Sequence, residues 1–412
     1  MKKFLSYIGC LLLLSPLCSV AQPMPADDNA VTRQYPFVST VFNRIFNSGG
    51  LDSFYRKLYT LKTTHTGTVN VVHIGDSHIQ ADFLSGQVRS GLQDFFGNAG
   101  RGLVFPYQVA QSNAPSDIAS YSNTRWQFNR IAHTEIPIAC GVAGFVIQTT
   151  TPGASINLSL KPGLTGLSPF NRLKFFTDSS ATTSWIVQAD NNAIPYIIKN
   201  EEDDTLAYRS VVLDQPATGF SLSSLPSDNL KAFYGVSLEN SNAGVLYHTI
   251  GVNGARYDQY NDASLFWQQL PALKADLYIV SLGTNEAQQA GFIEQAFSME
   301  VSTFIHKLQQ ASPGAAILIT TAPDSYKGRR SNTVLRSLNN SLTDYCNKNY
   351  LPLWDLYRIT NGYGSAYSWA RRGLMARDRV HFTQEGYRLQ GTLLLNALAK
   401  GYNNYVSVVG GQ

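Results

Sequence analysis

Charged side chains are scarce in this chain of 412 residues: Asp, Glu, Lys and Arg make up 15% of it, and the formal net charge is only +4. The lysines and arginines form no long basic run. A protein that binds nucleic acid needs a basic patch or stripe to neutralise phosphates. The composition therefore argues against a nucleic-acid partner. Hydrophobic residues, at 44%, are plentiful enough for a sizeable core.

Cysteine is rare as well, with four residues in the whole chain. Cys10 and Cys18 lie in the N-terminal apolar stretch, which leaves Cys140 and Cys346 for the rest of the protein. An oxidising compartment would permit this distant pair to form a disulfide, but we expect two unpaired core residues. No familiar metal-ligand spacing is present, so neither a metal site nor another cofactor is expected.

Long apolar runs are confined to the N-terminus, where Lys2 and Lys3 precede the apolar residues 4–17 and small residues surround Ala21. This pattern predicts a signal peptide at residues 1–21 that is removed after Ala21. The run is too short to span a membrane and is broken by Pro16, so no transmembrane segment is expected after cleavage. A retained anchor or a lipoprotein is the alternative, although the residues before Cys18 suit lipoprotein processing poorly.

The parts of the chain on either side of its middle favour alternating strands and helices. We expect helical structure in residues 38–61, a buried strand at 69–74 and one helix over 78–96. The pattern returns with strands at 245–250, 277–281, 317–319 and 351–356. Helices are expected at 263–273, 292–308, 334–345 and 383–398, the last capped by Thr383. Such alternation predicts a doubly wound parallel sheet with helices on both faces, a flavodoxin-like three-layer α/β fold.

Residues 107–244 have a different character. Short runs rich in β-branched and aromatic residues, such as 145–149 and 184–187, are separated by clusters of Gly, Pro, Asn and Asp. This spacing is typical of a β-sandwich or jelly roll. We therefore expect an all-β domain inserted between residues 22–106 and residues 245–412 of the α/β domain.

Four polar segments follow strands of the predicted sheet or precede its last helix. They are Gly75-Asp76-Ser77-His78, Gly251-Val252-Asn253-Gly254, Gly283-Thr284-Asn285-Glu286 and Asp378-Arg379-Val380-His381. The carboxyl ends of parallel strands meet at one edge of a sheet, so all four can reach one site. A serine hydroxyl there needs a base within hydrogen-bond reach and donors for an oxyanion. A spacing of three places Asp378 and His381 together on one turn.

The four segments resemble, in order, the motif blocks of the SGNH/GDSL hydrolase superfamily, with His78 where that family usually has leucine. The resemblance anchors the α/β portion and implies a Ser-His-Asp triad. Ser77 would be the nucleophile, His381 the base, and Asp378 the residue that orients His381. It further implies an oxyanion hole made of the Ser77 N–H, the Gly254 N–H and the Asn285 side-chain amide.

Several of these residues have other readings. Gly251 competes with Gly254 for the glycine role, and either could simply allow a tight turn. His73 and His78 flank Ser77 and suggest a metal site, but alternating strand positions would instead bury one and turn the other toward the cleft edge. Each block alone is a common loop sequence, and it is their joint order that indicates a hydrolase.

The stretch after Ser77, from His78 to Gly86, resembles bacterial peptidoglycan O-acetylesterases, which carry a β-rich domain like a carbohydrate-binding module at this point of the chain. We therefore expect an exported enzyme of the bacterial periplasm or cell envelope, or a secreted one, that removes O-acetyl groups from a glycan, with peptidoglycan as the leading substrate. Arg371, Arg372, Arg377 and Arg379 could bind an acidic glycan or form a solvated basic loop.

Three other functions stay open at this point. A deacetylase of another polysaccharide such as xylan would use the same triad, and a lipase or thioesterase would need an apolar acyl groove. A glycan-binding protein without catalysis is the non-enzyme alternative. The oligomeric state has no signal in the sequence.

Overall fold

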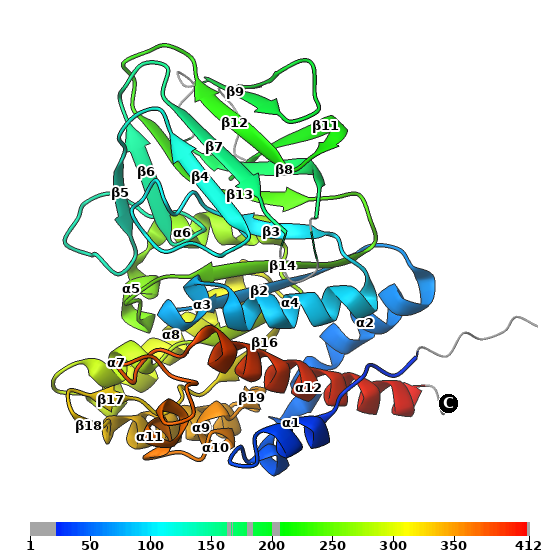
Figure 1. Cartoon of the computed structure of the whole chain (residues 1–412), viewed down its shortest axis with the longest axis vertical. Coiled ribbons are helices and arrows are strands. Elements are labelled where there is room, and N and C mark those ends of the chain that lie inside the picture. Colours follow the sequence, from blue (N-terminus) through cyan, green and yellow to red (C-terminus); the bar gives the residue numbers. More distant parts are fainter. Residues whose placement is uncertain (1–21, 163–165, 167, 179–183, 200–206, 410–412) are drawn as a thin grey trace, which may run out of the picture.

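The computed structural model describes residues 22–162, 166, 168–178, 184–199 and 207–409. The predicted signal peptide at residues 1–21 lies outside them. Two parts can be followed in Figure 1: a parallel sheet covered by helices, and antiparallel sheets that lie above its edge strand. Within the described residues, no helix combines the length and the apolar character needed to cross a membrane.

The helices and strands alternate at both ends of the chain, and the middle is all strands. The helices are α1 (Asp28–Gln34), α2 (Asp52–Thr64), α3 (Ser77–Gln80), α4 (Phe83–Phe96), α5 (Tyr257–Asp262), α6 (Ser264–Gln269), α7 (Thr284–Gln288), α8 (Glu294–Ala311), α9 (Val334–Lys348), α10 (Leu356–Ile359), α11 (Ser365–Ala370) and α12 (Gln384–Val409).

The central sheet has six strands in the order β1-β19-β16-β15-β2-β14, and all neighbours are parallel except β1 and β19. The strands are β1 (Ile45–Phe46), β2 (Thr68–Gly75), β14 (Gly244–Gly251), β15 (Leu277–Ser281), β16 (Ala316–Thr320) and β19 (Leu353–Trp354). The predicted doubly wound parallel sheet is confirmed.

Both faces of this sheet are buried, because successive residues of its strands enter opposite cores. In β2, Val69 and Val71 pack with α2, α4 and α12, whereas Val72 and Ile74 pack in the core that contains α8 and α9. A strand buried on both sides reads as a continuous apolar run. This is why residues 69–74 are recognisable as a strand from sequence.

The middle of the chain forms two antiparallel sheets, with orders β10-β9-β12-β7-β4 and β11-β8-β13-β6-β5. The strands are β3 (Gly100–Val104), β4 (Ile118–Ser122), β5 (Gln127–Arg130), β6 (Phe145–Thr149), β7 (Ser155–Leu160), β8 (Phe170–Thr177), β9 (Ser184–Ala189), β10 (Tyr196–Lys199), β11 (Arg209–Ala217), β12 (Gly219–Ser224) and β13 (Lys231–Glu239). Rings from the two sheets meet edge to face, with Phe175 of β8 at 5.5 Å from Phe220 of β12. The sheets therefore share one core, as in a sandwich.

Strand β3 joins this β-rich region to the α/β part: it pairs with β13 and lies over β14 (Figure 1). A buried ion network reinforces the junction. The carboxylate of Asp82 accepts from Arg89 at 2.6 Å and from Arg101 at 2.7 Å, and Arg101 also binds Asp117 at 2.5 Å. All four side chains are at most 12% exposed. Charges that deeply buried are held by their partners, so the network ties α4 to the start of the β-rich region.

Two helix predictions were wrong in part. Residues 38–61 do not form one helix: α2 starts only at Asp52, after two short 3₁₀ turns and strand β1, and Val41 is 78% exposed. Residues 78–96 form two helices, because Asp82 has φ of 60° and breaks the helical path. The network that holds the Asp82 carboxylate involves residues far along the chain, and helical periodicity carries no trace of it.

The cysteines are unpaired: Cys140 and Cys346 are both free and buried. Trp126 and Trp185 are buried too, at 6% and 0% exposure. Both tryptophans are core residues of the β-rich region. The predicted domain boundaries at residues 106 and 244 stay predictions.

Candidate active site

The turn after β2 places Ser77 at the carboxyl edge of the central sheet. Asp76 caps α3, its side chain accepting from the His78 N–H at 2.9 Å, so Ser77 is the first residue of that helix. Gly75 is needed for this turn, since a Cβ there would lie 2.4 Å from the Ile79 side chain and 2.9 Å from the Ser281 carbonyl oxygen. N–H groups in the first turn of a helix have no partner within it, and the Ser77 N–H is one of these.

The predicted triad residues are brought together although Ser77 lies 304 positions before His381 in sequence. The Nε2 atom of His381 is 2.9 Å from Ser77 Oγ, and its Nδ1 atom is 2.7 Å from Asp378 Oδ2. Because a carboxylate only accepts, Nδ1 donates to Asp378, and this leaves Nε2 free to accept from the serine hydroxyl. The arrangement has the order and the distances that proton removal from Ser77 requires.

The loop that carries Asp378 stabilises the charged form of its carboxyl group. Its other oxygen, Oδ1, accepts from the N–H groups of Val380 at 2.9 Å and His381 at 3.0 Å. Partial burial raises the pKa of Asp378, but the hydrogen bonds from the His381 ring and the two N–H groups outweigh it and hold that pKa below its usual value. The sharp turn leaves Arg379 with φ of 54°.

Asn285 stands between the nucleophile turn and the glycine turn. As the second residue of α7, it donates from Nδ2 to the Ala255 carbonyl oxygen at 3.0 Å and lies 3.4 Å from Asp76 Oδ2. Asp76 is 1% exposed, and this burial raises its pKa to about 7 against the lowering effects of the His78 N–H and the His381 charge. The side-chain amide is thus fixed beside the residue that precedes Ser77.

The two candidate glycines differ in their surroundings. Gly251 ends β14 against α3, and a Cβ on it would lie 2.2 Å from the Gln80 nitrogen, so close packing alone requires glycine there. Gly254 has φ of 84° in an exposed turn closed by the Ala255 N–H, which donates to the Val252 carbonyl oxygen at 3.0 Å. This favours Gly254 over Gly251 as a residue with an N–H available to a ligand.

The histidines beside Ser77 face different partners. His73 is buried, with its ring nitrogens 2.8 Å from Tyr247 Oη and from Ser281 Oγ. His78 places Nδ1 3.0 Å from Tyr387 Oη and packs its ring against that of His381. Neither histidine therefore turns to the cleft edge as an open ligand. The described residues hold no group of three or more His, Cys, Asp or Glu side chains suited to a metal ion.

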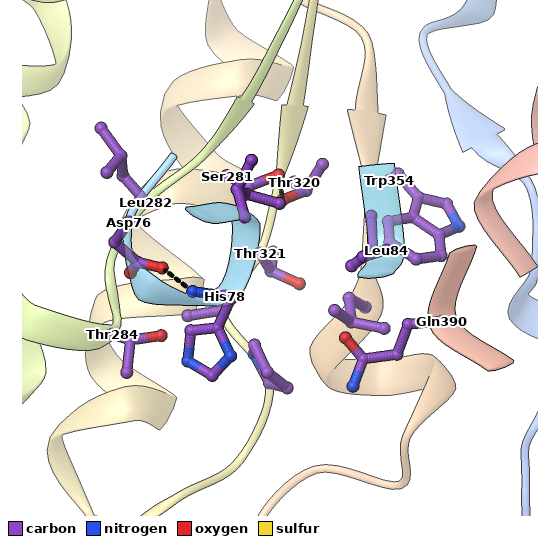
Figure 2. A pocket seen from close by; sticks show the side chains of 14 residues that line it. Asp76, His78, Leu84, Ser281, Leu282, Thr284, Thr320, Thr321, Trp354 and Gln390 are labelled. Atoms are coloured by element: carbon purple, nitrogen blue, oxygen red, sulfur yellow. Dashed lines mark hydrogen bonds between the residues drawn. The ribbon is translucent and has the colours of Figure 1, made fainter. Parts of the chain in front are cut away.

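A pocket lies behind the nucleophile turn, between it, the ends of β15 and β16, and α12 (Figure 2). Its walls include Asp76, His78, Ser281, Thr320 and Gln390, but neither Ser77 nor His381. The buried Nε2 atoms of His78 and Gln390 have no hydrogen-bond partner among the described residues. The surface that lines this pocket is nonetheless mostly apolar.

The arginines around the Asp–His pair are partly engaged with aromatic rings. The Arg379 guanidinium lies 4.7 Å from the Tyr326 ring centre and 5.7 Å from that of Tyr367, and Arg372 lies 4.3 Å from that of Phe37. Arg371 and Arg377 are exposed. The basic loop stays a candidate contact for an acidic substrate.

Comparison with known proteins gives one family match and several similar solved structures. Residues 217–389 match the GDSL-like Lipase/Acylhydrolase family, a stretch that includes Gly254, Asn285, Asp378 and His381 but begins after Ser77. A solved structure described as a peptidoglycan O-acetylesterase in action is 23% identical, with a TM-score of 0.72 over 85% of this chain and 96% of that one. No curated protein matches the chain.

Other similar structures cover less or superpose less well. A carbohydrate esterase family 2 enzyme with a carbohydrate-binding domain from Corynascus thermopiles is 10% identical, with a TM-score of 0.31 over 67% of this chain and 99% of that one. A lipase/acylhydrolase from Enterococcus faecalis is 22% identical, with a TM-score of 0.31 over 38% of this chain and 77% of that one.

The fold and the matched residues together define a carboxylic ester hydrolase. Its parallel sheet lies between two layers of helices. More narrowly, residues 217–389 match the GDSL-like lipase/acylhydrolase family, and the fold is that of an SGNH hydrolase with an additional all-β region.

Proposed function

We propose that this protein is an exported serine esterase that removes O-acetyl groups from a cell-wall glycan, with peptidoglycan as its substrate. The observation that carries the catalytic part is the unbroken chain of hydrogen bonds from Ser77 through His381 to Asp378. The similarity over most of its length to a protein described as a peptidoglycan O-acetylesterase, and the predicted signal peptide, support the substrate and the location.

The residues act in two half-reactions. Ser77 Oγ attacks the acetyl carbonyl carbon while His381 Nε2 takes the hydroxyl proton, and the oxygen that becomes negative is held by the N–H groups of Ser77 and Gly254 and by the Asn285 amide. The C–O bond to the sugar then breaks, and the proton on His381 passes to the sugar oxygen. Water, activated by His381, attacks the acetyl-Ser77 ester and releases acetate and the free serine.

Acetate release from purified O-acetylated peptidoglycan tests the proposal. The wild-type protein should release acetate, and Ser77→Ala should lower the rate by about 10⁶-fold while keeping the thermal melting temperature. Ester hydrolysis that survives Ser77→Ala would overturn the mechanism. Because the serine side chain is small, the variant should fold like the wild type. The melting curve checks this.

Two further substrates separate the alternatives within the ester hydrolases. Acetylated xylan should be a poorer substrate than O-acetylated peptidoglycan, and a higher kcat/KM on xylan would assign a different polysaccharide. With 4-nitrophenyl esters of increasing acyl length, activity should be highest for acetate. Activity that rises with chain length would instead indicate a lipase or thioesterase.

A further inference from the structure

Gln80, three residues after Ser77, is a buried side chain that no step of the esterase mechanism uses. It is the last residue of α3 and is 1% exposed. Its Oε1 atom accepts the Asn253 N–H at 2.8 Å. A buried amide makes hydrogen bonds wherever it can, and this one connects the helix of the nucleophile to the glycine turn.

The other end of the Gln80 amide reaches into the loop between β3 and β4. Nε2 lies 2.8 Å from Ser112 Oγ and 2.8 Å from both the carbonyl and the side-chain oxygen of Asn113, so its two hydrogens are shared among three acceptors. The Asn113 side-chain oxygen also accepts from Asn253 Nδ2 at 2.6 Å. Gln80, Asn113 and Asn253 thus form a closed ring of hydrogen bonds.

This ring holds Asn253 at two points, its N–H and its side chain, directly before Gly254. The orientation of the peptide plane between these residues decides where the Gly254 N–H points. Glycine adopts the φ of 84° seen at Gly254 without strain, so its own conformational preference does not fix the turn. Ala132 lies beside the turn, since a Cβ built on Gly254 would be in ordinary van der Waals contact with the Ala132 Cβ, at 3.5 Å.

We propose that Gln80 and Asn113 are positioning residues that hold the Asn253–Gly254 turn so that the Gly254 N–H faces the reacting ester oxygen. The inference rests on the proposed function, because the Gly254 N–H has this role only if the esterase mechanism forms a negatively charged oxygen that needs a hydrogen-bond donor. Asn113 lies in the region predicted as the inserted domain, as does Ala132. The β-rich region therefore shapes the oxyanion site itself, whether or not it also binds glycan.

Steady-state kinetics with 4-nitrophenyl acetate test this without depending on the glycan. Gln80→Met keeps the length of the side chain and removes its hydrogen bonds, and kcat should fall by about 10- to 100-fold with little change in KM, since a displaced donor weakens only the transition state. The pH profile should keep its shape, because the triad is untouched. A wild-type kcat, or a rise in KM alone, would overturn the inference.

The exposed Asn113 supplies a second test should Gln80→Met fail to fold. Asn113→Ala removes the shared acceptor and should lower kcat about 3- to 10-fold, whereas Asn113→Asp keeps an oxygen for both donors and should restore most of the rate. Asn123→Ala is the matched control: this exposed asparagine binds only Gly153 and Ser155 within the β-rich region, and kcat should not change. Equal effects of Asn113→Ala and Asn123→Ala would mean a merely structural role and overturn the inference.

These experiments distinguish failure of the esterase mechanism from failure of the positioning role. If Ser77→Ala retains hydrolysis of 4-nitrophenyl acetate, the esterase mechanism falls and the positioning role falls with it. If Ser77→Ala is inactive while Gln80→Met and Asn113→Ala have wild-type kcat, only the positioning role is overturned.

Discussion

The imidazole rings of His78 and His381 lie 5.6 Å apart between ring centres, with an angle of 32° between their planes. One ring belongs to the residue after the candidate nucleophile and the other to the candidate base. Burial, together with the charge of His381, lowers the pKa of His78 to about 3 against the opposing effect of Asp378. His78 is therefore an uncharged neighbour, which supports the His381 ring without opposing its protonation.

Replacing His78 by leucine, the residue usual in the family, should lower kcat by about 3- to 10-fold because the His381 ring loses a packing partner. The acidic limb of the plot of kcat/KM against pH should not move, since a neutral ring contributes no charge to lose. A shift of that limb by more than about half a pH unit would mean that His78 is charged during turnover. Tyr387→Phe, which removes only the hydroxyl beside His78, is the milder companion variant.

Asn285→Ala should lower kcat by about 100- to 1000-fold, the usual effect of removing one side-chain donor from an oxyanion site. KM should change little, because the donor acts on charge that develops only in the transition state. The Asn285 amide donates to the Ala255 carbonyl oxygen in the free protein, so melting curves must accompany the kinetics. A large rise in KM with an unchanged kcat would assign Asn285 to substrate binding instead.

The sequence alone was sufficient to predict the candidate catalytic residues, because their types and their order along the chain indicate the chemistry. Ser77, Asp378 and His381 are predicted together because their blocks resemble, in order, those of SGNH/GDSL hydrolases. The blocks follow buried strands or precede the last helix, and such strands are the most readable elements of a parallel sheet. The structure places these side chains within hydrogen-bond distance. Their catalytic roles stay proposals until variants are assayed.

What could not be predicted depends on long-range polar contacts. Gln80 and Asn113 are ordinary polar residues in sequence, and only folding brings them to Asn253. The break in the helix at Asp82 has a similar origin, because local periodicity continues across it while Arg89 of α4 and Arg101 of β3 hold its carboxylate. Hydrophobic spacing reports which face is buried, but it does not report which polar groups meet there.

The ion network between α4 and the β-rich region should be costly to break. Arg101→Met leaves Asp82 and Asp117 buried with Arg89 as their remaining cation, and the free energy of unfolding should fall by about 3–5 kcal/mol. Urea denaturation measures this change.

Arg33→Met is the control for that measurement. It removes an arginine whose side chain is 73% exposed and whose partner, Asp27, is 62% exposed, so it should cost less than about 1 kcal/mol. Similar losses for the two variants would mean that the buried network adds nothing beyond a surface pair.

Two buried groups, His248 and Glu286, should make the free energy of unfolding depend on pH in opposite directions. His248 accepts the Leu103 N–H at its Nδ1 atom, and burial, together with the Lys174 charge, lowers its pKa to about 3. Burial raises the pKa of Glu286 to about 7, although its bond from the Tyr257 N–H acts the other way. Below about pH 6.5 the unfolded chain binds a proton at His248 that the folded protein does not. The contribution of His248 to the free energy of unfolding is therefore lost as pH falls. Between about pH 4.5 and 7 only the folded protein holds the proton on Glu286, so that contribution is lost as pH rises.

Glutamine variants at the two positions isolate these effects, since glutamine can accept the same N–H and does not titrate. Relative to the wild type, the unfolding free energy of His248→Gln should improve by up to about 1.4 kcal/mol for each pH unit as pH falls from 6.5 to 5.5. That of Glu286→Gln should improve by a similar amount for each unit as pH rises over the same range. Urea denaturation of the three proteins at pH 5.5, 6.0 and 6.5 measures both slopes. Parallel slopes for the two variants would contradict the assignment of an uncharged His248 and a protonated Glu286, because those states require slopes of opposite sign.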